Sequence, residues 1–80
     1  MNQAQRRGLA RLMLRWPQRR TELRARCGQD TRFLELSEAY ETACEAADYW
    51  AKSSSPEARA RAEEYRALSS EIERDIDELF

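Results

Sequence analysis

The sequence contains no histidine, and that absence excludes several kinds of chemistry. No imidazole is present to act as a general acid or base near neutral pH, or to activate a serine or cysteine nucleophile. Zinc sites that combine cysteine with histidine are excluded too. We therefore expect a protein that is not an enzyme and that holds no metal or other cofactor.

Glycine and cysteine are scarce. The two glycines, Gly8 and Gly28, are too few and too far apart to form a glycine-rich loop that cradles phosphate. The two cysteines, Cys27 and Cys44, lie seventeen residues apart and do not make a disulfide framework, so we expect both thiols to be reduced. Because Arg26 precedes it, Cys27 should be the more acidic thiol, and redox sensing is an alternative role for it.

Long apolar runs are absent as well. The longest, Leu12-Met13-Leu14, is far shorter than the roughly 20 apolar residues that span a bilayer. The sequence therefore predicts a soluble protein, and its two reduced thiols favour the cytoplasm. A chain of 80 residues forms one domain with a small core, so a second subunit is expected to add stability.

The formal net charge of −1 conceals two halves of opposite charge. Residues 1–26 hold eight arginines against one glutamate, a net charge of +7. Residues 27–80 hold six basic and fourteen acidic residues, a net charge of −8. Two such halves either attract each other or leave the basic half for an external anion, and the sequence does not decide between these.

One stretch has the clearest helical pattern in the chain, and it predicts a helix over about 31–51. Its apolar residues recur at spacings of three and four and so share one face: Phe33, Leu36, Tyr40, Ala43, Ala47 and Trp50. The outward face is expected to carry the acidic residues Glu35, Glu38, Glu41, Glu45 and Asp48. Asp30 or Thr31 is expected to cap the start of the helix. Leu34 and Tyr49 fall on the acidic side, where they are candidates for contact with the basic N-terminal part of the chain or with another chain.

A loop rich in serine separates this helix from a second one, predicted over about 56–79. We expect Ser55 to cap the second helix and Pro56 to occupy its first position. Its apolar face repeats through Ala58, Ala62, Tyr65, Leu68, Ile72, Ile76 and Leu79. Arg61 falls inside that face, so it needs either Asp48 as a partner or a path to solvent along its own side chain.

The short loop favours an antiparallel hairpin over residues 30–80, because about five residues suffice to join two helices that turn back on each other. A hairpin alone leaves the back of each apolar face in water. We therefore expect an all-α fold: a helical hairpin with an N-terminal helical arm, associated as a homodimer into a helical bundle.

Residues 1–29 are expected to form a basic helical arm. Over residues 4–16 the apolar side chains fall on one face, and Pro17 ends this helix. Gly8 is expected to weaken it. A short helix follows, and Gly28 is expected to end that helix in the left-handed conformation, which glycine adopts without steric cost.

The apolar side of the arm is expected to dock on the hairpin, so that its arginines meet acidic residues of the same or another subunit. The candidate interaction residues are Leu9, Leu12, Trp16, Arg7, Arg11, Arg15, Arg19, Arg20, Leu34 and Tyr49. A protein interaction or adaptor module explains the charges of both halves and is the preferred interpretation. A regulator that binds nucleic acid through the arm is the first alternative, and a peripheral membrane module is the second.

The segment Phe33-x-x-Leu36-x-x-x-Tyr40-x-x-Ala43, followed by Trp50, a serine and proline loop and Glu64-Tyr65-Arg66-x-Leu68, resembles small all-helical bacterial proteins of uncharacterised function. The resemblance covers about residues 30–80 and consists mainly of core spacing. It implies a helical hairpin in a bacterial cytoplasm and no catalytic residues. The arginine-rich start of the chain lies outside it.

Overall fold

The computed structural model describes every residue from Met1 to Phe80. It is entirely helical, which confirms the all-α prediction. Four α-helices span Gln3–Arg15 (α1), Arg20–Cys27 (α2), Thr31–Ala51 (α3) and Ala58–Asp77 (α4), and a 3₁₀ turn (η1) spans Pro17–Arg19. None of the helices combines the length and the apolar composition that crossing a lipid bilayer requires.

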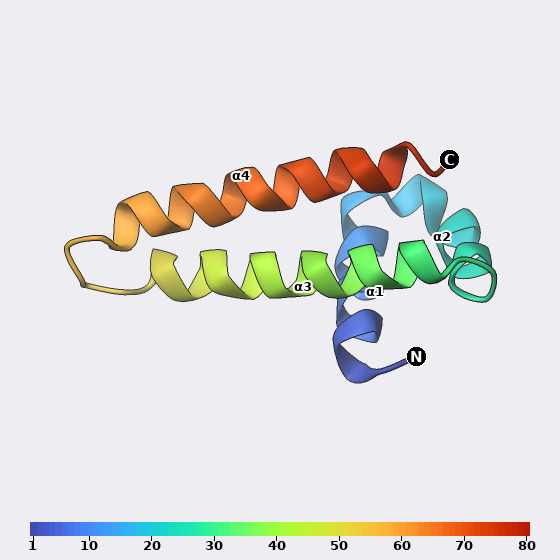
Figure 1. Cartoon of the computed structure of the whole chain (residues 1–80), viewed down its shortest axis with the longest axis horizontal. Helices are drawn as coiled ribbons and strands as arrows, with labels where there is room; N and C mark the ends of the chain where they lie inside the picture. Colours follow the sequence, from blue (N-terminus) through green and yellow to red (C-terminus); the bar gives the residue numbers. More distant parts are fainter.

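Two long helices form the body of the molecule (Figure 1). α3 and α4 lie side by side and run in opposite directions, joined by a short loop at one end. α1 crosses α3 nearer the other end, and α2 lies at the tip away from that loop. The molecule is elongated, at 43 × 23 × 20 Å. Below, the loop end means residues 47–62, and the core end means the part where α1 and α2 meet α3 and α4.

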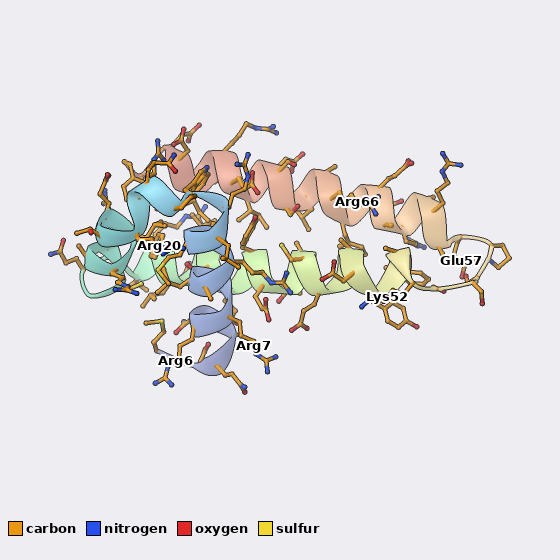
Figure 2. The ribbon with its side chains drawn as sticks, turned by 180° about the vertical axis from the view of Figure 1, so that it is seen from behind. Arg6, Arg7, Arg20, Lys52, Glu57 and Arg66 are labelled. Atoms are coloured by element: carbon orange, nitrogen blue, oxygen red, sulfur yellow. The ribbon has the colours of Figure 1, made fainter.

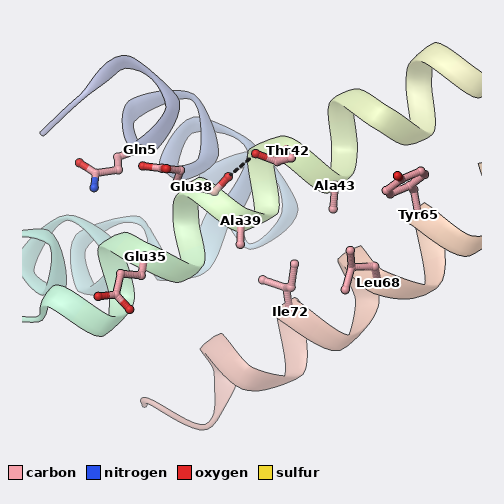
Figure 3. A pocket seen from close by; sticks show the side chains of 9 residues that line it. All are labelled: Gln5, Glu35, Glu38, Ala39, Thr42, Ala43, Tyr65, Leu68 and Ile72. Atoms are coloured by element: carbon pink, nitrogen blue, oxygen red, sulfur yellow. Dashed lines mark hydrogen bonds between the residues drawn. The ribbon is translucent and has the colours of Figure 1, made fainter.

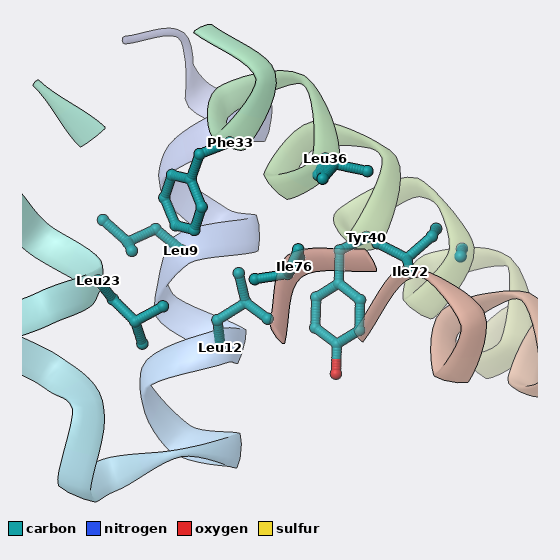
Figure 4. Packing of buried hydrophobic residues seen from close by; sticks show 9 residues of the cluster. Leu9, Leu12, Leu23, Phe33, Leu36, Tyr40, Ile72 and Ile76 are labelled. Atoms are coloured by element: carbon teal, nitrogen blue, oxygen red, sulfur yellow. The ribbon is translucent and has the colours of Figure 1, made fainter. Parts of the chain in front are cut away.

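The buried apolar side chains gather at the core end (Figure 4). The cluster consists of Leu9, Leu12, Leu23, Phe33, Leu36, Tyr40, Ala43, Ile72 and Ile76. Its first three members come from α1 and α2. The basic segment, which is the N-terminal arm of residues 1–29, therefore supplies part of the core. Outside the cluster the buried apolar side chains are those of Ala47, Ala58 and Ala62, and an alanine removes little apolar area from water. Apolar burial therefore falls steeply from the core end to the loop end.

The crossing of α1 over α3 depends on a glycine. A β-carbon at Gly8 would lie 1.8 Å from the backbone oxygen of Ser37, far inside van der Waals contact. Ser37 is fully buried, and its hydroxyl donates a hydrogen bond of 2.9 Å to the carbonyl of Phe33. The sequence predicts only that Gly8 weakens α1, whereas in the structure the missing side chain lets the two backbones touch.

Polar side chains cap the starts of α1 and α3. The side chain of Asn2 accepts a hydrogen bond of 2.7 Å from the amide of Gln5, whose own side chain accepts one of 2.9 Å from the amide of Asn2. This capping box satisfies two amides that have no partner within the helix. At α3 the side chain of Asp30 accepts from the amide of Phe33 at 3.2 Å, so the first of the two predicted caps is confirmed.

The predicted conformation of Gly28 is wrong. Gly28 follows α2 in the right-handed region, with a φ of −87°, and no glycine in the chain has a positive φ. The reason is that the helix tightens as it ends. The amide of Gly28 bonds to the carbonyl of Ala25, and the amide of Gln29 bonds to that of Arg26, in a geometry that any residue can adopt.

α4 is shorter than predicted at both ends. It begins at Ala58 and not at Pro56, because a turn closed by the amide of Ala58 on the carbonyl of Ser55 comes first. The predicted cap at Ser55 is therefore wrong: the residue at the cap position is Glu57, which makes no capping hydrogen bond through its side chain. At the other end α4 stops at Asp77, where the chain again tightens into a 3₁₀-like turn.

Candidate interaction surface

The arginines of α1 and η1 lie against acidic residues of α3 and α4. They recur every four residues, so they form one stripe along the basic segment. The pairs are Arg7 with Glu45 at 3.6 Å, Arg11 with Asp48 at 3.8 Å, Arg15 with Glu73 at 3.4 Å and Arg19 with Asp77 at 2.5 Å. Four of the candidate arginines are thus brought together on carboxylates of their own chain.

Arg11 also holds the one buried carboxylate, that of Glu41. The Glu41 side chain is 5% exposed, and Arg11 Nε donates a hydrogen bond to its Oε1 at 2.5 Å. Burial raises the pKa of the Glu41 carboxyl, but the hydrogen bond from Arg11 and the nearby positive charges outweigh burial, so the pKa is lowered. The same hydrogen bond raises the pKa of Arg11. The predicted outward position of Glu41 is wrong, because α1 covers a second face of α3.

Tyr40 links α3 to α4 beside this pair. Its hydroxyl donates a hydrogen bond of 2.6 Å to Oε2 of Glu73, the carboxylate that also pairs with Arg15. Burial, followed by this hydrogen bond, raises the pKa of Tyr40 well above its usual value. The hydroxyl therefore stays protonated and serves as a fixed donor between two helices.

Both cysteines are free thiols, and neither has the surroundings of a reactive thiolate. Burial raises the pKa of the Cys27 thiol, which donates to the carbonyl of Leu23 at 3.4 Å. Burial also raises the pKa of Cys44, by more than the positive charge of Arg11 lowers it. The arginines near Cys27 thus do not lower its pKa, because its side chain packs against the core and a thiolate there would lose its hydration. That Cys27 is the more acidic of the two thiols stays a prediction. No three acidic or cysteine side chains stand in an arrangement that could hold a metal ion.

Three arginines of the basic segment project into solvent and pair with no carboxylate. They are Arg6, Arg20 and Arg24, of which Figure 2 labels the first two. Arg20 Nε lies 3.5 Å from the carbonyl oxygen of Met13, a contact with the backbone and not with an acid. These three are the arginines of the basic segment that the fold leaves without a carboxylate.

The apolar candidates of the basic segment face inward. Leu9 and Leu12 belong to the core, at 8% and 0% exposed. Trp16 is half-buried, and the guanidinium of Arg19 lies 5.4 Å from the centroid of its ring, within reach of a cation–π interaction. A membrane contact through Leu9 and Leu12 would require both to leave the core.

The two apolar candidates of α3 differ from each other. Leu34 is half-buried near the start of the helix. Tyr49 is 65% exposed and meets Trp50 edge to face, with ring centroids 5.1 Å apart. Only Tyr49 therefore offers a largely open apolar surface.

An open groove of about 510 Å³ runs between α3 and α4 (Figure 3). Its apolar lining consists of Ala39, Ala43, Tyr65, Leu68 and Ile72, and its polar lining of Gln5, Glu35, Glu38 and Thr42. Leu68 is 41% exposed. The sequence candidates include none of these residues. The signal that could have identified the groove is the match between small side chains on the first long helix and large ones on the second.

Arg61 stands one helical turn from Tyr65, on the side of the groove toward the loop end. Its side chain is 52% exposed and lies 3.3 Å from Glu64, so it takes the path to solvent. Asp48, the alternative partner, pairs with Arg11 instead.

Comparison with models of known protein families, with curated proteins and with solved structures finds no match to this chain. The function proposed for the chain therefore rests on its own side chains.

Proposed function

We propose that this protein is a non-enzymatic interaction module, in which a helical hairpin (residues 30–80), held by a basic arm (residues 1–29), presents its α3–α4 surface to another protein chain. The contrast between two sides of α3 carries this proposal. On the side toward α1, its carboxylates are occupied by arginines of the same chain. On the groove side, apolar side chains and the carboxylates of Glu35 and Glu38 are open to solvent.

The state of the buried polar groups supports a role in holding helices together. Acid–base catalysis works best with groups whose pKa lies near the working pH. The pKa values of Tyr40 and Cys44 are instead shifted upward, away from neutrality. Glu41 is held ionised by Arg11, as a structural ion pair is.

We propose a second copy of the chain as the partner, so that the working unit is a homodimeric helical bundle. Support comes from the loop end, where two helices meet through Ala47, Ala58 and Ala62 and no third helix covers them. Two helices alone bury little apolar area, and bundles of four are a frequent solution to that problem. The two free thiols favour the cytoplasm as the compartment.

Light scattering over a range of protein concentrations, at low and high salt, tests this proposal. We expect the molar mass of two chains, with dissociation only on dilution. A molar mass of one chain at every concentration would contradict the homodimer.

A regulatory role through nucleic acid is the second candidate function, and the observation that favours it is the set of unpaired cations Arg6, Arg20 and Arg24. Three phosphate contacts predict that the logarithm of duplex affinity falls against the logarithm of salt concentration with a slope of about −3. Fluorescence anisotropy with a labelled DNA duplex measures this slope. Replacement of all three arginines by alanine should abolish binding, and an absence of binding by the parent chain at about 50 mM salt would remove this candidate.

A further inference from the structure

We infer that the groove between α3 and α4 is the seam of a two-fold dimer, in which Leu68 of one copy packs against Leu68 of the other and Arg61 of each copy faces Glu35 and Glu38 of its partner. This inference rests on the proposed homodimer. It adds the surface, the orientation and the side chains by which one copy recognises the next.

The groove has the form of a helix-packing surface. On α3 its lining includes Ala39 and Ala43, whose small side chains let another helix approach closely. On α4, Tyr65, Leu68 and Ile72 follow at spacings of three and four and so share one face. Leu68 is the large apolar side chain that the chain leaves most exposed on this face. A second apolar helix pair would cover it.

Opposite charges stand at the two ends of the groove. The carboxylates are at the end toward the core, and the guanidinium of Arg61 is at the end toward the loop. Each charge has only an exposed partner within its own chain. Glu35 pairs with Arg32 at 4.0 Å, Glu38 accepts a hydrogen bond of 2.9 Å from the side-chain amide of Asn2, and Arg61 pairs with Glu64 at 3.3 Å. Exposed contacts of this kind contribute little to stability, so these charged groups are free to exchange partners.

Spacing along the helices relates the two sets of charges. Leu68 lies beside Ala43 in the groove (Figure 3). Arg61 lies seven residues before Leu68, or about 10 Å along α4. Glu35 and Glu38 lie eight and five residues before Ala43, or about 12 and 8 Å along α3. Because the two helices run in opposite directions, the guanidinium and the carboxylates stand at similar distances on opposite sides of Leu68.

This arrangement is complementary to itself. A two-fold axis that lies in the interface, passes through Leu68 and runs at right angles to the long direction of the groove places Arg61 of each copy at the end of the groove where the other copy carries its carboxylates. A two-fold interface requires such self-complementarity, since the same surface serves both partners. The parallel arrangement is disfavoured, because it would set Glu35 and Glu38 of the two copies against each other.

Charge reversal tests the seam. Sedimentation equilibrium at about 50 mM salt, where exposed charges are weakly screened, measures the dissociation constant of the dimer. Glu35→Lys with Glu38→Lys should weaken the dimer about tenfold, and so should Arg61→Glu, because each change acts twice across the two-fold axis. The triple variant that combines them should recover the parent affinity to within about threefold.

The matched control is Glu22→Lys with Glu63→Lys, which changes the net charge as much as the double groove variant. Both residues are exposed and neither lines the groove, so the dissociation constant should be unchanged. Leu68→Glu is a second, independent variant that should leave only monomers. Circular dichroism of each variant checks that its helix content is retained.

The outcomes separate the seam from the dimer. Recovery in the triple variant supports both the surface and the orientation. If the dimer of the triple variant has a larger dissociation constant than the dimers of both the double glutamate variant and Arg61→Glu, the orientation is wrong. If no groove variant changes the dissociation constant, the groove is not the interface, and the homodimer forms through another surface. A parent chain that is always monomeric would overturn both, and would leave the groove to a helix of a different protein.

Discussion

Glu41 owes its ionised state to one residue, Arg11. The carboxylate is almost fully buried, and Arg11 supplies a hydrogen bond as well as positive charge. A buried charge without a partner is costly, since nothing replaces its lost hydration. The two residues therefore act as a unit, and removing one alone is worse than replacing both.

Replacement of Arg11 by alanine should lower the free energy of unfolding by about 2 kcal/mol. Fully buried pairs lose about 3–5 kcal/mol in such experiments, and the Arg11 side chain is 35% exposed, which reduces the effect. Urea unfolding at pH 7 and one fixed protein concentration measures the change. The matched control is Arg7→Ala, whose pair with Glu45 is more than half exposed and should contribute less than about 0.5 kcal/mol. If the two variants lose the same free energy of unfolding, the burial of Glu41 does not strengthen its pair with Arg11.

The same carboxylate predicts a dependence on pH. The pKa of Glu41 is lower in the folded chain than its usual value of about 4.3, so the folded state binds this proton less readily than the unfolded state. Its contribution to stability is therefore fully present above that usual value and is lost as the pH falls through the lowered folded pKa. In the Arg11→Ala variant the Glu41 carboxyl is still buried but has lost the arginine, so its neutral, protonated form is favoured.

The stability difference between the parent chain and Arg11→Ala should therefore shrink as the pH falls from about 7 to 4. Urea unfolding of both proteins at intervals over this range measures the difference. A gap that stayed constant would show that Glu41 does not titrate as its surroundings require.

At the scale of the helices, what the sequence could predict was local. The extent of α3, Thr31–Ala51, follows from its own apolar spacing and from Asp30, and the structure agrees with it. The burial of Glu41 could not be predicted in this way. Nothing within α3 distinguishes Glu41 from Glu45 until the position of α1 is known, and that position depends on a contact between Gly8 and Ser37.

The same limit applies to the interaction surface. The arginines of α1 and η1 that pair with carboxylates form a stripe on one side of the basic segment. Its partners lie on two other helices, up to 58 residues away, so no local pattern could name them. The groove is missed for a similar reason, since Ala39 and Leu68 line one surface only when α3 and α4 lie side by side.

Gly8→Ala should destabilise the fold by about 2 kcal/mol, although alanine favours a helix over glycine by about 1 kcal/mol. The added β-carbon would collide with the backbone of Ser37, which has no room to move because it is buried. Thermal unfolding followed by circular dichroism measures the effect. Ala10→Gly, at an exposed position of the same helix, is the control and should cost only the difference in propensity. A Gly8→Ala protein more stable than the parent would mean that α1 and α3 do not touch at Gly8 and Ser37.

At the scale of the whole molecule, stability is unevenly distributed. The core end holds the large buried side chains, whereas the buried apolar side chains of the loop end are alanines, accompanied by the half-buried Trp50. Regions with few buried apolar contacts open at a lower free energy than the global unfolding does. The loop end should therefore open locally while the core end stays folded.

Amide hydrogen exchange should show this difference. At concentrations where the chain is monomeric, amides of residues 47–62 should exchange at least about tenfold faster than those of residues 33–40 and 72–76. Mass spectrometry of peptides from timed exchange samples gives both rates. Uniform protection along α3 and α4 would contradict the uneven core. Slower exchange at the loop end on raising the protein concentration would instead report association.

The ion pairs of the basic segment also set an order of events during synthesis. Arg19 finds its carboxylate at Asp77, 58 residues later in the chain. At about 5–20 residues per second, a ribosome needs about 3–12 seconds to make that partner. During this interval Arg19 lacks the carboxylate that it contacts in the folded chain. The pairing of the basic segment with the acidic helices is therefore completed only after α4 has been translated.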